Sequence, residues 1–228
     1  MPSDPKHQLL ELLARHSFRL GNFKLSSGGV SDYYIDCRLT TLSALGGLLT
    51  AQLFLDNLMG IEPRLDPPLE AVGGMTLGAD PIAVGVAIES ARTAAPPARP
   101  LDAFLVRKSE KAHGTGRRIE GEVRPGARVA IVDDVCTTAA STIQAIEAAW
   151  EAELDVVAVR CLVEREEGGG RRNLDELWHA HRGGACPFEA LFGAQEVRAA
   201  HKELLRRGET FSGPAGGGPV NESAGGAR

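Results

Sequence analysis

The chain has 228 residues, which at roughly 150 residues per domain allows one or two domains. Hydrophobic residues make up 43% and charged residues 24%, so a core can form and a wholly disordered chain is excluded. Lys and Arg number 25 against 30 Asp and Glu, and the net charge of −5 argues against broad electrostatic binding of nucleic acid or an anionic membrane. Any positively charged site must be local.

Targeting and redox features are weak in this sequence. It has no run of about 18 apolar residues, and the polar residues 1–6 have no apolar stretch behind them, so neither a membrane span nor a secretory signal is predicted. The cysteines lie far apart without metal or redox spacing, which predicts free thiols. They are Cys37, Cys136, Cys161 and Cys186. A cytoplasmic location is expected.

The first 60 residues predict two helices with a β segment between them. Ser3 or Asp4 as N-cap, Pro5 in the first turn and leucines at helical spacing indicate a helix over residues 5–16. Residues 23–38 combine small residues with short alternations, which indicates a hairpin-like or irregular β segment. A second helix is expected over residues 43–59.

From residue 69 onward, apolar runs, turns and helix-length stretches follow one another as in βα units. The strands expected are residues 69–72, 103–106, 128–132, 156–163 and, more weakly, 189–191; the helices are 79–93, 138–153 and 194–207. The strands at 103–106, 128–132 and 156–163 are β-branched without polar alternation, so we expect burial on both faces in an α/β fold with a mostly parallel sheet flanked by helices. Residues 212–228 hold six Gly and two Pro and are expected to be a disordered tail.

The most informative segment is VAIVDDVCTTAAST, residues 129–142. A buried strand here delivers two carboxylates, Asp133 and Asp134, to its C-terminal end, and a hydroxyl-rich turn then opens a helix. In open α/β sheets ligands bind at that edge. The turn offers N–H groups and hydroxyls for a phosphate, and the carboxylates suit sugar hydroxyls or a hydrated magnesium ion.

Two other interpretations apply to this segment, and a third concerns a separate glycine-containing string. In the simplest, Asp133 only caps the turn and residues 137–141 merely begin a helix. A Walker B strand would need a P-loop, yet the dipeptide Gly-Lys never occurs. The string at residues 114–116 begins like a dinucleotide fingerprint, but Ile119 stands where the third glycine belongs and no strand leads directly into it.

The strand, the acidic pair and the turn together resemble the phosphoribosyl pyrophosphate (PRPP) motif of the type I phosphoribosyltransferases. The resemblance implies that Asp133 and Asp134 face the ribose hydroxyls and that residues 137–142 bind the 5′-phosphate. The expected PRPP contacts in this turn are Thr137, Thr138, Ala139, Ala140 and Ser141. Family members usually have a glycine near position 139; since alanine tolerates a positive φ poorly, a reshaped turn or an altered phosphate affinity is expected.

Residues 107–121 form a basic, glycine-containing loop with five Lys or Arg against two Glu, a local balance of +3. Alone, it would equally fit a solvated surface loop. Its spacing R-K-x-x-K-x-H-G-x-G, however, resembles the catalytic loop of orotate phosphoribosyltransferases. The resemblance implies that Arg107, Lys108, Lys111 and His113 surround the pyrophosphate, with Lys111 and His113 as catalytic residues on the part that closes. It also implies a homodimer in which loop 107–120 acts in the neighbouring subunit.

Residues 23–38 contain both tyrosines of the chain. By itself this segment would be a small packed hairpin, but L-S-S-G-G-V-S-D-Y-Y at residues 25–34 is similar to the orotate-binding segment of the same family. The resemblance implies that Tyr34 and Ile35 lie against the pyrimidine ring. It places Ser26, Ser27 and Thr137 among the orotate contacts.

Two further segments match the family. The string T-L-G-A-D-P at residues 76–81 resembles a loop that binds pyrophosphate through backbone N–H groups, which implies PRPP contacts at Thr76, Leu77 and Gly78. The string E-R-E-E-G-G at residues 164–169 resembles a turn whose arginine, here Arg165, holds the orotate carboxylate; a lone arginine there would more often form a surface ion pair. His179, His181 and Cys186 fit no zinc spacing.

The resemblance covers about residues 5–206. It implies a single type I phosphoribosyltransferase domain, residues 1–211, with a base-binding hood from about residues 1–40. The expected reaction converts orotate and PRPP to orotidine 5′-monophosphate and pyrophosphate in pyrimidine biosynthesis. Mg²⁺ is expected to bind through PRPP, with water molecules bridging the ion to Asp133 or Asp134. The alternatives are a transferase for another nucleobase, which should lack the loop and tyrosine motifs, and a non-catalytic PRPP-binding regulator, which only Ala139 and Ala140 favour.

Overall fold

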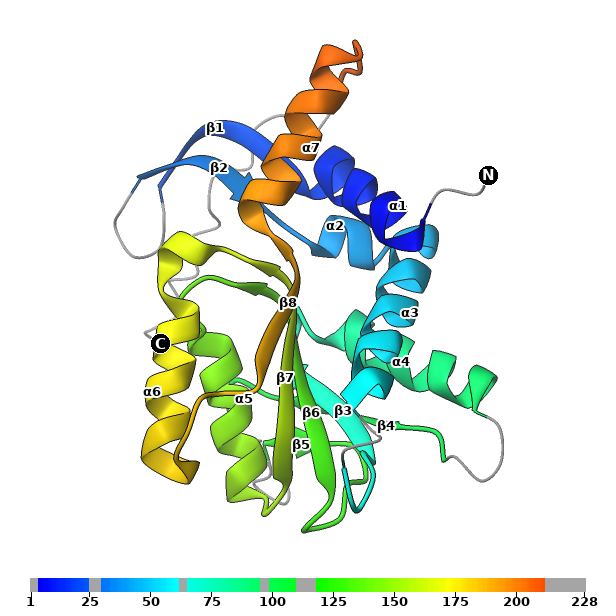
Figure 1. The fold of residues 1–228 in the computed structure, drawn as a ribbon, viewed down its shortest axis with the longest axis vertical. Helices are drawn as coiled ribbons and strands as arrows, with labels where there is room; N and C mark the ends of the chain where they lie inside the picture. Colours follow the sequence, from blue (N-terminus) through cyan, green and yellow to red (C-terminus); the bar gives the residue numbers. More distant parts are fainter. Residues whose placement is uncertain (1–3, 25–29, 62–64, 95–98, 110–117, 212–228) are drawn as a thin grey trace, which may run out of the picture.

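The computed structural model describes residues 4–24, 30–61, 65–94, 99–109 and 118–211. Within them a six-stranded sheet has the order β5-β4-β3-β6-β7-β8 (Figure 1). The strands are β3 (Ala71–Met75), β4 (Asp102–Val106), β5 (Ile119–Glu120), β6 (Arg128–Cys136), β7 (Asp155–Glu164) and β8 (Phe188–Gly193). Neighbouring strands are parallel except β4 and β5. The prediction of a mostly parallel sheet is confirmed.

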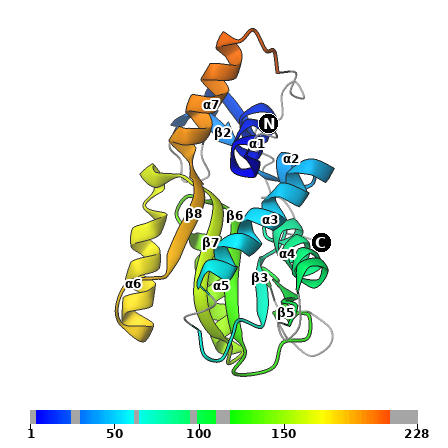
Figure 2. The same ribbon diagram turned by 45° about the vertical axis from the view of Figure 1, so that its right-hand side comes forward.

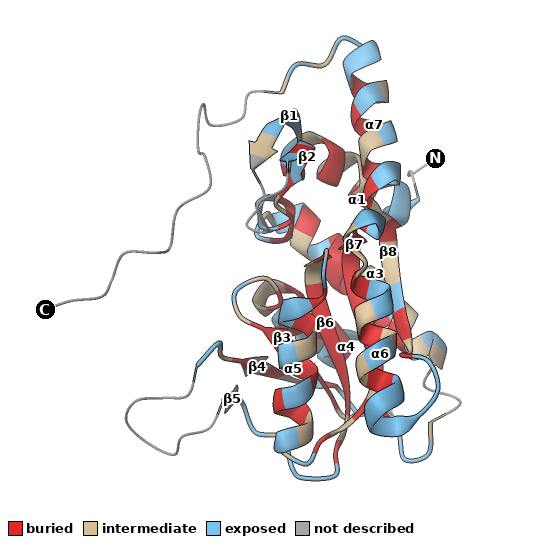
Figure 3. Cartoon of the chain, turned by 90° about the vertical axis from the view of Figure 1, so that its left-hand side faces the viewer, coloured by how far each residue is buried: buried red, intermediate tan, exposed pale blue. Residues whose placement is uncertain are grey.

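Helices cover both faces of this sheet. In Figure 2, α3 (Ala44–Ile61) and α4 (Asp80–Thr93) lie on one side and α6 (Gly170–Arg182) lies on the other, where Figure 1 shows α5 (Ala140–Glu151) beside it. Figure 3 shows β6 and β7 as buried strands between these layers. Each face has its own apolar cluster, with Val132 and Leu162 in one and Ile131 and Val159 in the other, all fully buried. Alternate residues of β6 and β7 therefore point to opposite layers, as expected for strands without polar alternation.

Above the C-terminal edge of the sheet stands a smaller unit (Figure 1). It contains α1 (Pro5–Leu12), the π-helix η1 (Leu13–Ser17), the antiparallel strands β1 (Phe18–Lys24) and β2 (Val30–Ile35), the short α2 (Arg38–Thr41) and the C-terminal α7 (Ala194–Arg206). The predicted N-cap is present, since Asp4 accepts a hydrogen bond from the Lys6 N–H at 3.3 Å. Phe18 stacks on Tyr33 and contacts His201 of α7, so α7 completes the hood assigned to residues 1–40.

Strand β3 differs from the prediction over residues 69–72 because it runs on through Gly73 and Gly74 to Met75. These glycines do not make a turn. A Cβ on Gly74 would lie 2.0 Å from the Val132 carbonyl oxygen, and one on Gly73 would lie 2.4 Å from the Phe104 carbonyl oxygen. The glycines permit close backbone approach inside the sheet, which is the usual reason for glycine within a strand.

Two helices were not predicted. The first is α2, a single turn, and the second is α6, whose buried Leu174 and Trp178 stand four residues apart on an otherwise polar helix. That spacing is a helical signal, but three consecutive glycines at its start and many charged residues obscure it. The helix predicted over residues 138–153 begins later, at Ala140, because residue 139 belongs to the preceding turn.

Helix α3 is, among the described helices, the one long and apolar enough to cross a membrane by length and composition. It packs against α1 and α4, and it buries Leu49, Phe54 and Leu58 in the core. The four cysteines are free, as predicted, and the structure shows that all four are buried.

Candidate active site

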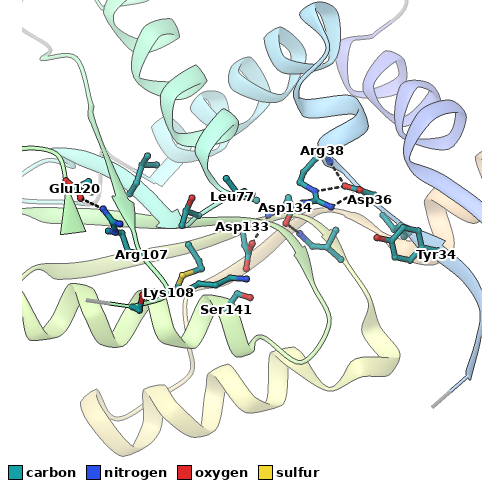
Figure 4. Close-up of a pocket in the computed structure, with 17 residues that line it drawn as sticks. Tyr34, Asp36, Arg38, Leu77, Arg107, Lys108, Glu120, Asp133, Asp134 and Ser141 are labelled. Atoms are coloured by element: carbon teal, nitrogen blue, oxygen red, sulfur yellow. Dashed lines mark hydrogen bonds and ion pairs between the residues drawn. The ribbon is translucent and has the colours of Figure 1, made fainter. Parts of the chain in front are cut away.

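A cavity of about 750 Å³ opens at the C-terminal edge of β3, β4 and β6, below the hood. Figure 4 shows the acidic pair Asp133 and Asp134 between Arg107 and Lys108 on one side and Tyr34 on the other. Of the predicted site residues, those that line the cavity are Tyr34, Ile35, Thr76, Leu77, Gly78, Arg107, Lys108, Asp133, Asp134 and Ser141. The structure therefore brings together segments that are up to about 100 residues apart in the chain.

The acidic pair is held rigidly by the end of β6. Asp133 is only 5% exposed and accepts hydrogen bonds from the Thr142 hydroxyl at 2.7 Å and from the Asp134 N–H at 2.9 Å. Burial, together with the neighbouring charge of Asp134, raises the pKa of Asp133 to about 7. Burial also raises the pKa of Asp134, which accepts a hydrogen bond from the Val135 N–H. A site that disfavours two negative charges in this way is suited to receive hydroxyl donors or a cation.

Residues 76–78 lie directly against the acidic pair. A Cβ on Gly78 would be 2.4 Å from Oδ1 of Asp134, so any other residue at position 78 would require the Asp134 carboxylate to shift. The Thr76 N–H donates to the Val106 carbonyl and its hydroxyl donates to Asp80, both at 2.9 Å. The Thr76–Leu77 peptide bond is cis. The loop at the end of β3 is thus fixed at both of its ends beside Asp134.

The cavity contains both positive and negative side chains. Arg107 donates to Glu120 at 2.8 Å across the β4–β5 pair. Asp36 and Arg38, which were not among the predicted site residues, form an ion pair at 2.9 Å on the hood side of the cavity. A signal was present, because two opposite charges directly follow the predicted tyrosine segment. The other lining residues that were not predicted are Met75, Leu105, Ser109, Glu120 and Val135.

The turn after β6 keeps a left-handed residue at position 139. Ala139 has φ 62° and ψ 14° and stands at the N-cap of α5. The expected reshaping of the turn is wrong in this respect, because alanine adopts the backbone conformation that glycine would favour, at a cost of about 1 kcal/mol. Thr137, Thr138 and Ala140 lie in or beside this turn but do not line the cavity described above.

The start of α6 supports this turn from behind. A Cβ on Gly168 would lie 2.3 Å from the Thr137 carbonyl oxygen, and one on Gly170 would lie 2.7 Å from the same atom. The Asn173 side chain donates to the Thr138 carbonyl at 3.0 Å. Because α6 was not predicted, Asn173 was missed as a residue that positions the turn.

Stability measurements test the left-handed conformation. Ala139→Gly relieves backbone strain, whereas Ala140→Gly places glycine in the first turn of α5, where it costs about 0.5–1 kcal/mol. We therefore expect Ala139→Gly to be the more stable of the two variants by about 1 kcal/mol in urea unfolding. Equal losses in both variants would contradict this assignment.

Arg165 lies outside the lining of this cavity. Its backbone N–H donates to the Cys136 carbonyl at 2.8 Å, which places it at the same sheet edge, and its guanidinium contacts Ser31, Tyr33 and Glu167. The arginine is 7% exposed, so it forms a buried cluster and not the surface pair considered above. Its role toward a substrate carboxylate stays a prediction.

Four predicted site residues lie outside the described residues: Ser26, Ser27, Lys111 and His113. The same holds for the expected tail, residues 212–228. Among the described residues, no group of three or more His, Cys, Asp or Glu side chains is arranged to hold a metal. His179 and His181 are exposed on α6, where His181 stacks on Trp150, whereas Cys186 is buried.

Comparison with known proteins gives a consistent result, although no protein-family model matches the chain. Orotate phosphoribosyltransferases of Streptomyces coelicolor and Aquifex aeolicus are each 38% identical to it over 195 residues, covering 86% and 84% of this chain and 98% and 97% of theirs. The orotate phosphoribosyltransferase of Mycobacterium tuberculosis in complex with PRPP matches with a TM-score of 0.64 and 30% identity, over 86% of this chain and 99% of that one.

The parallel sheet, the hood and the cavity between them define a type I phosphoribosyltransferase, a fold that the matching structures share. Within this class the chain belongs to the orotate phosphoribosyltransferase family, whose members are enzymes that move a pentosyl group. The comparisons do not favour a transferase for another base or a non-catalytic regulator.

Proposed function

We propose that the protein transfers the phosphoribosyl group of PRPP to orotate, in a magnesium-dependent reaction that serves pyrimidine biosynthesis in the cytoplasm. The observation that supports this most is the meeting, in one cavity, of the acidic pair, residues 76–78, Arg107 with Lys108, and Tyr34. Each of these segments matches the family motif for a different part of the two substrates. Together they provide positions for a ribose, a pyrophosphate and a pyrimidine ring.

Asp133 and Asp134 are assigned to the ribose hydroxyls of PRPP. Their burial disfavours the doubly charged state, so the pair fits a water-bridged Mg²⁺ carried by PRPP. When bound, the ion shares the negative charge of the pyrophosphate. Thr137, Thr138, Ala139, Ala140 and Ser141 are assigned to the 5′-phosphate, where N–H groups at the start of α5 favour an anion.

The cations are assigned to the leaving group. As the C1–O bond to pyrophosphate breaks, negative charge builds on the leaving oxygen while N1 of orotate attacks C1 from the opposite face. Fixed positive charges near that oxygen lower the barrier. Arg107 and Lys108 line the same cavity as Thr76, Leu77 and Gly78, which are also assigned to the pyrophosphate. Lys111 and His113 of the same loop are proposed to complete this set, and loop closure would exclude water.

The reaction itself is tested by the ultraviolet absorbance of orotate with purified protein, PRPP and Mg²⁺. Orotate should be consumed only when both PRPP and Mg²⁺ are present, while uracil, adenine and hypoxanthine should give no nucleotide by chromatography. Turnover of another base would replace the proposed substrate. PRPP binding without turnover of any base would indicate a regulator.

A homodimer is proposed as the active form. Several large apolar side chains are exposed on α2 and the residue after it, on α3, on α4 and on the loop before α4; α3 packs against both α2 and α4. They are Leu39, Leu42, Leu45, Leu48, Leu77, Val84 and Ile88. A second copy would cover such a surface, and because Leu77 also lines the cavity, the partner would stand at the rim of the site.

Subunit mixing tests whether loop 107–120 acts across the dimer. Lys111→Ala subunits and Asp134→Ala subunits should each be nearly inactive. After exchange, a random mixture should regain about a quarter of wild-type activity, because one site in four then has both an intact core and an intact loop. Light scattering should give the mass of a dimer for both variants. No recovery, despite proven exchange, would mean that the loop serves its own subunit.

A further inference from the structure

The side chains around Arg165 form a receptor for a carboxylate. The Arg165 Nη2 donates to the Ser31 hydroxyl at 3.1 Å, and its Nε donates to the Tyr33 hydroxyl at 3.2 Å. The guanidinium carbon lies 4.4 Å from the centre of the Tyr33 ring. This packing fixes a planar cation next to a phenolic donor. Such a pair is well suited to bind a carboxylate.

The carboxylate of Glu167 occupies this receptor. The Tyr33 hydroxyl donates to Oε1 of Glu167, and Arg165 donates to the same oxygen from Nη2 at 3.2 Å and from Nε at 3.4 Å. Among the described residues, none accepts a hydrogen bond from Nη1 of Arg165. The pairing is therefore monodentate and long, and it uses only part of the guanidinium fork, which could hold a bidentate carboxylate more strongly.

The two side chains of this ion pair differ in exposure: that of Glu167 can turn out of the receptor into solvent, whereas that of Arg165 is buried. The Glu167 side chain is 49% exposed on the single 3-10 turn η3 (Glu166–Gly168), and that of Arg165 is 8% exposed. Burial disfavours the charge of Glu167, but the hydrogen bonds from Tyr33 and Arg165 outweigh it and lower the pKa of Glu167. Burial and the bond to Glu167 raise the pKa of Tyr33 to about 12. At neutral pH Glu167 is thus an anion and Tyr33 a donor.

We infer that Glu167 is an internal competitor of the substrate: its carboxylate fills the receptor of Arg165 and Tyr33 in the free protein, and the carboxylate of orotate replaces it. This inference rests on the proposed function, because it requires orotate to bring its carboxylate to Arg165. The apparent affinity for orotate then equals the intrinsic affinity multiplied by the fraction of molecules in which Glu167 does not occupy the receptor. A base without a carboxylate, such as uracil, leaves Glu167 in place.

The variant Glu167→Gln tests the exchange because it removes the charge and keeps the size. We expect the KM for orotate to fall about two- to fivefold, as for a partly exposed ion pair. The KM for PRPP and the binding of uracil should not change. Glu166→Gln is the matched control: it removes the same charge from the same turn, where the carboxylate lies beside Gly193. It should keep the wild-type KM. Initial rates and calorimetric binding of orotate and uracil provide the data.

Several results would overturn the inference. An unchanged or higher orotate KM in Glu167→Gln would show that Glu167 only orients Arg165 or has no part in binding. An equal gain in Glu166→Gln would show a general effect of charge. Arg165→Ala should raise the KM for orotate about tenfold or more and affect that for PRPP far less; the opposite order would place the carboxylate elsewhere. If wild-type protein turns over no orotate at all, the proposed function itself fails.

Discussion

Replacing Lys111 with alanine is expected to lower kcat by about two to three orders of magnitude, with less than about a threefold change in PRPP affinity. The reason is that PRPP in its ground state keeps its other contacts. Residues 76–78, Arg107, Lys108 and the acidic pair line the described cavity. The Lys111 charge acts mainly when pyrophosphate leaves. An interaction present only in the transition state affects kcat and not binding.

Single-turnover kinetics and equilibrium binding of PRPP separate these two effects for Lys111. The variant Lys111→Arg keeps the charge and should recover much of the lost rate, which distinguishes the charge from a purely steric role. An unchanged kcat in Lys111→Ala would remove this lysine from the mechanism. A large loss of PRPP affinity with an unchanged single-turnover rate would instead make it a ground-state contact.

Local periodicity was sufficient to predict most of the sheet. The strands β4, β6 and β7 are aliphatic runs whose only plausible environment is a doubly covered sheet, and they appear within a few residues of the predicted bounds. Strand β3 was mispositioned because Gly73 and Gly74 look like a turn in sequence, although their absent side chains serve the close contact with Val132 and Phe104. Tertiary contact, which no local pattern contains, decided that element.

The candidate site also contains parts that the sequence could predict and parts that it could not. Asp133 and Asp134 lie near the end of β6 and Arg107 directly follows β4. Because both strands end at one sheet edge, their meeting could be predicted from the rule for open α/β sheets. The contact of Tyr33 with Arg165 and Glu167 could not be predicted, because Tyr33 is more than 130 positions from both and the contact depends on how the hood sits over β7. The left-handed Ala139 was also unforeseen, since the intrinsic preference of alanine opposes it and the supporting contacts come from α6, a helix hidden by its polar composition.

Asp133→Asn is expected to reduce activity about a hundredfold and, at alkaline pH, to stabilise the protein. The pKa of Asp133 is about 7 in the folded protein, above its unfolded value of 3.8. The folded state therefore binds the proton more tightly. The contribution of this group to stability is complete at pH values below 3.8. It is lost at about 1.4 kcal/mol per pH unit as the pH rises from 3.8 to 7, and it levels off above 7, where both states are deprotonated.

Asparagine at position 133 resembles the protonated acid and does not titrate, so Asp133→Asn should lack this pH dependence. The stability of the variant relative to wild-type protein should therefore rise by about 3 kcal/mol between pH 5 and pH 8.5, with little further change above pH 7. Urea unfolding at both pH values, in the absence of Mg²⁺, measures this difference. The Thr142 hydroxyl, which now donates to Asp133, can accept from the asparagine amide, so the buried position remains hydrogen-bonded.

Greater stability of wild-type protein at pH 8.5 would show that the carboxylate is well compensated when charged. Equal activity in both proteins would remove Asp133 from ribose binding. The expected pair of results, activity lost and stability gained, would mean that the fold bears the cost of a buried charge because PRPP requires it.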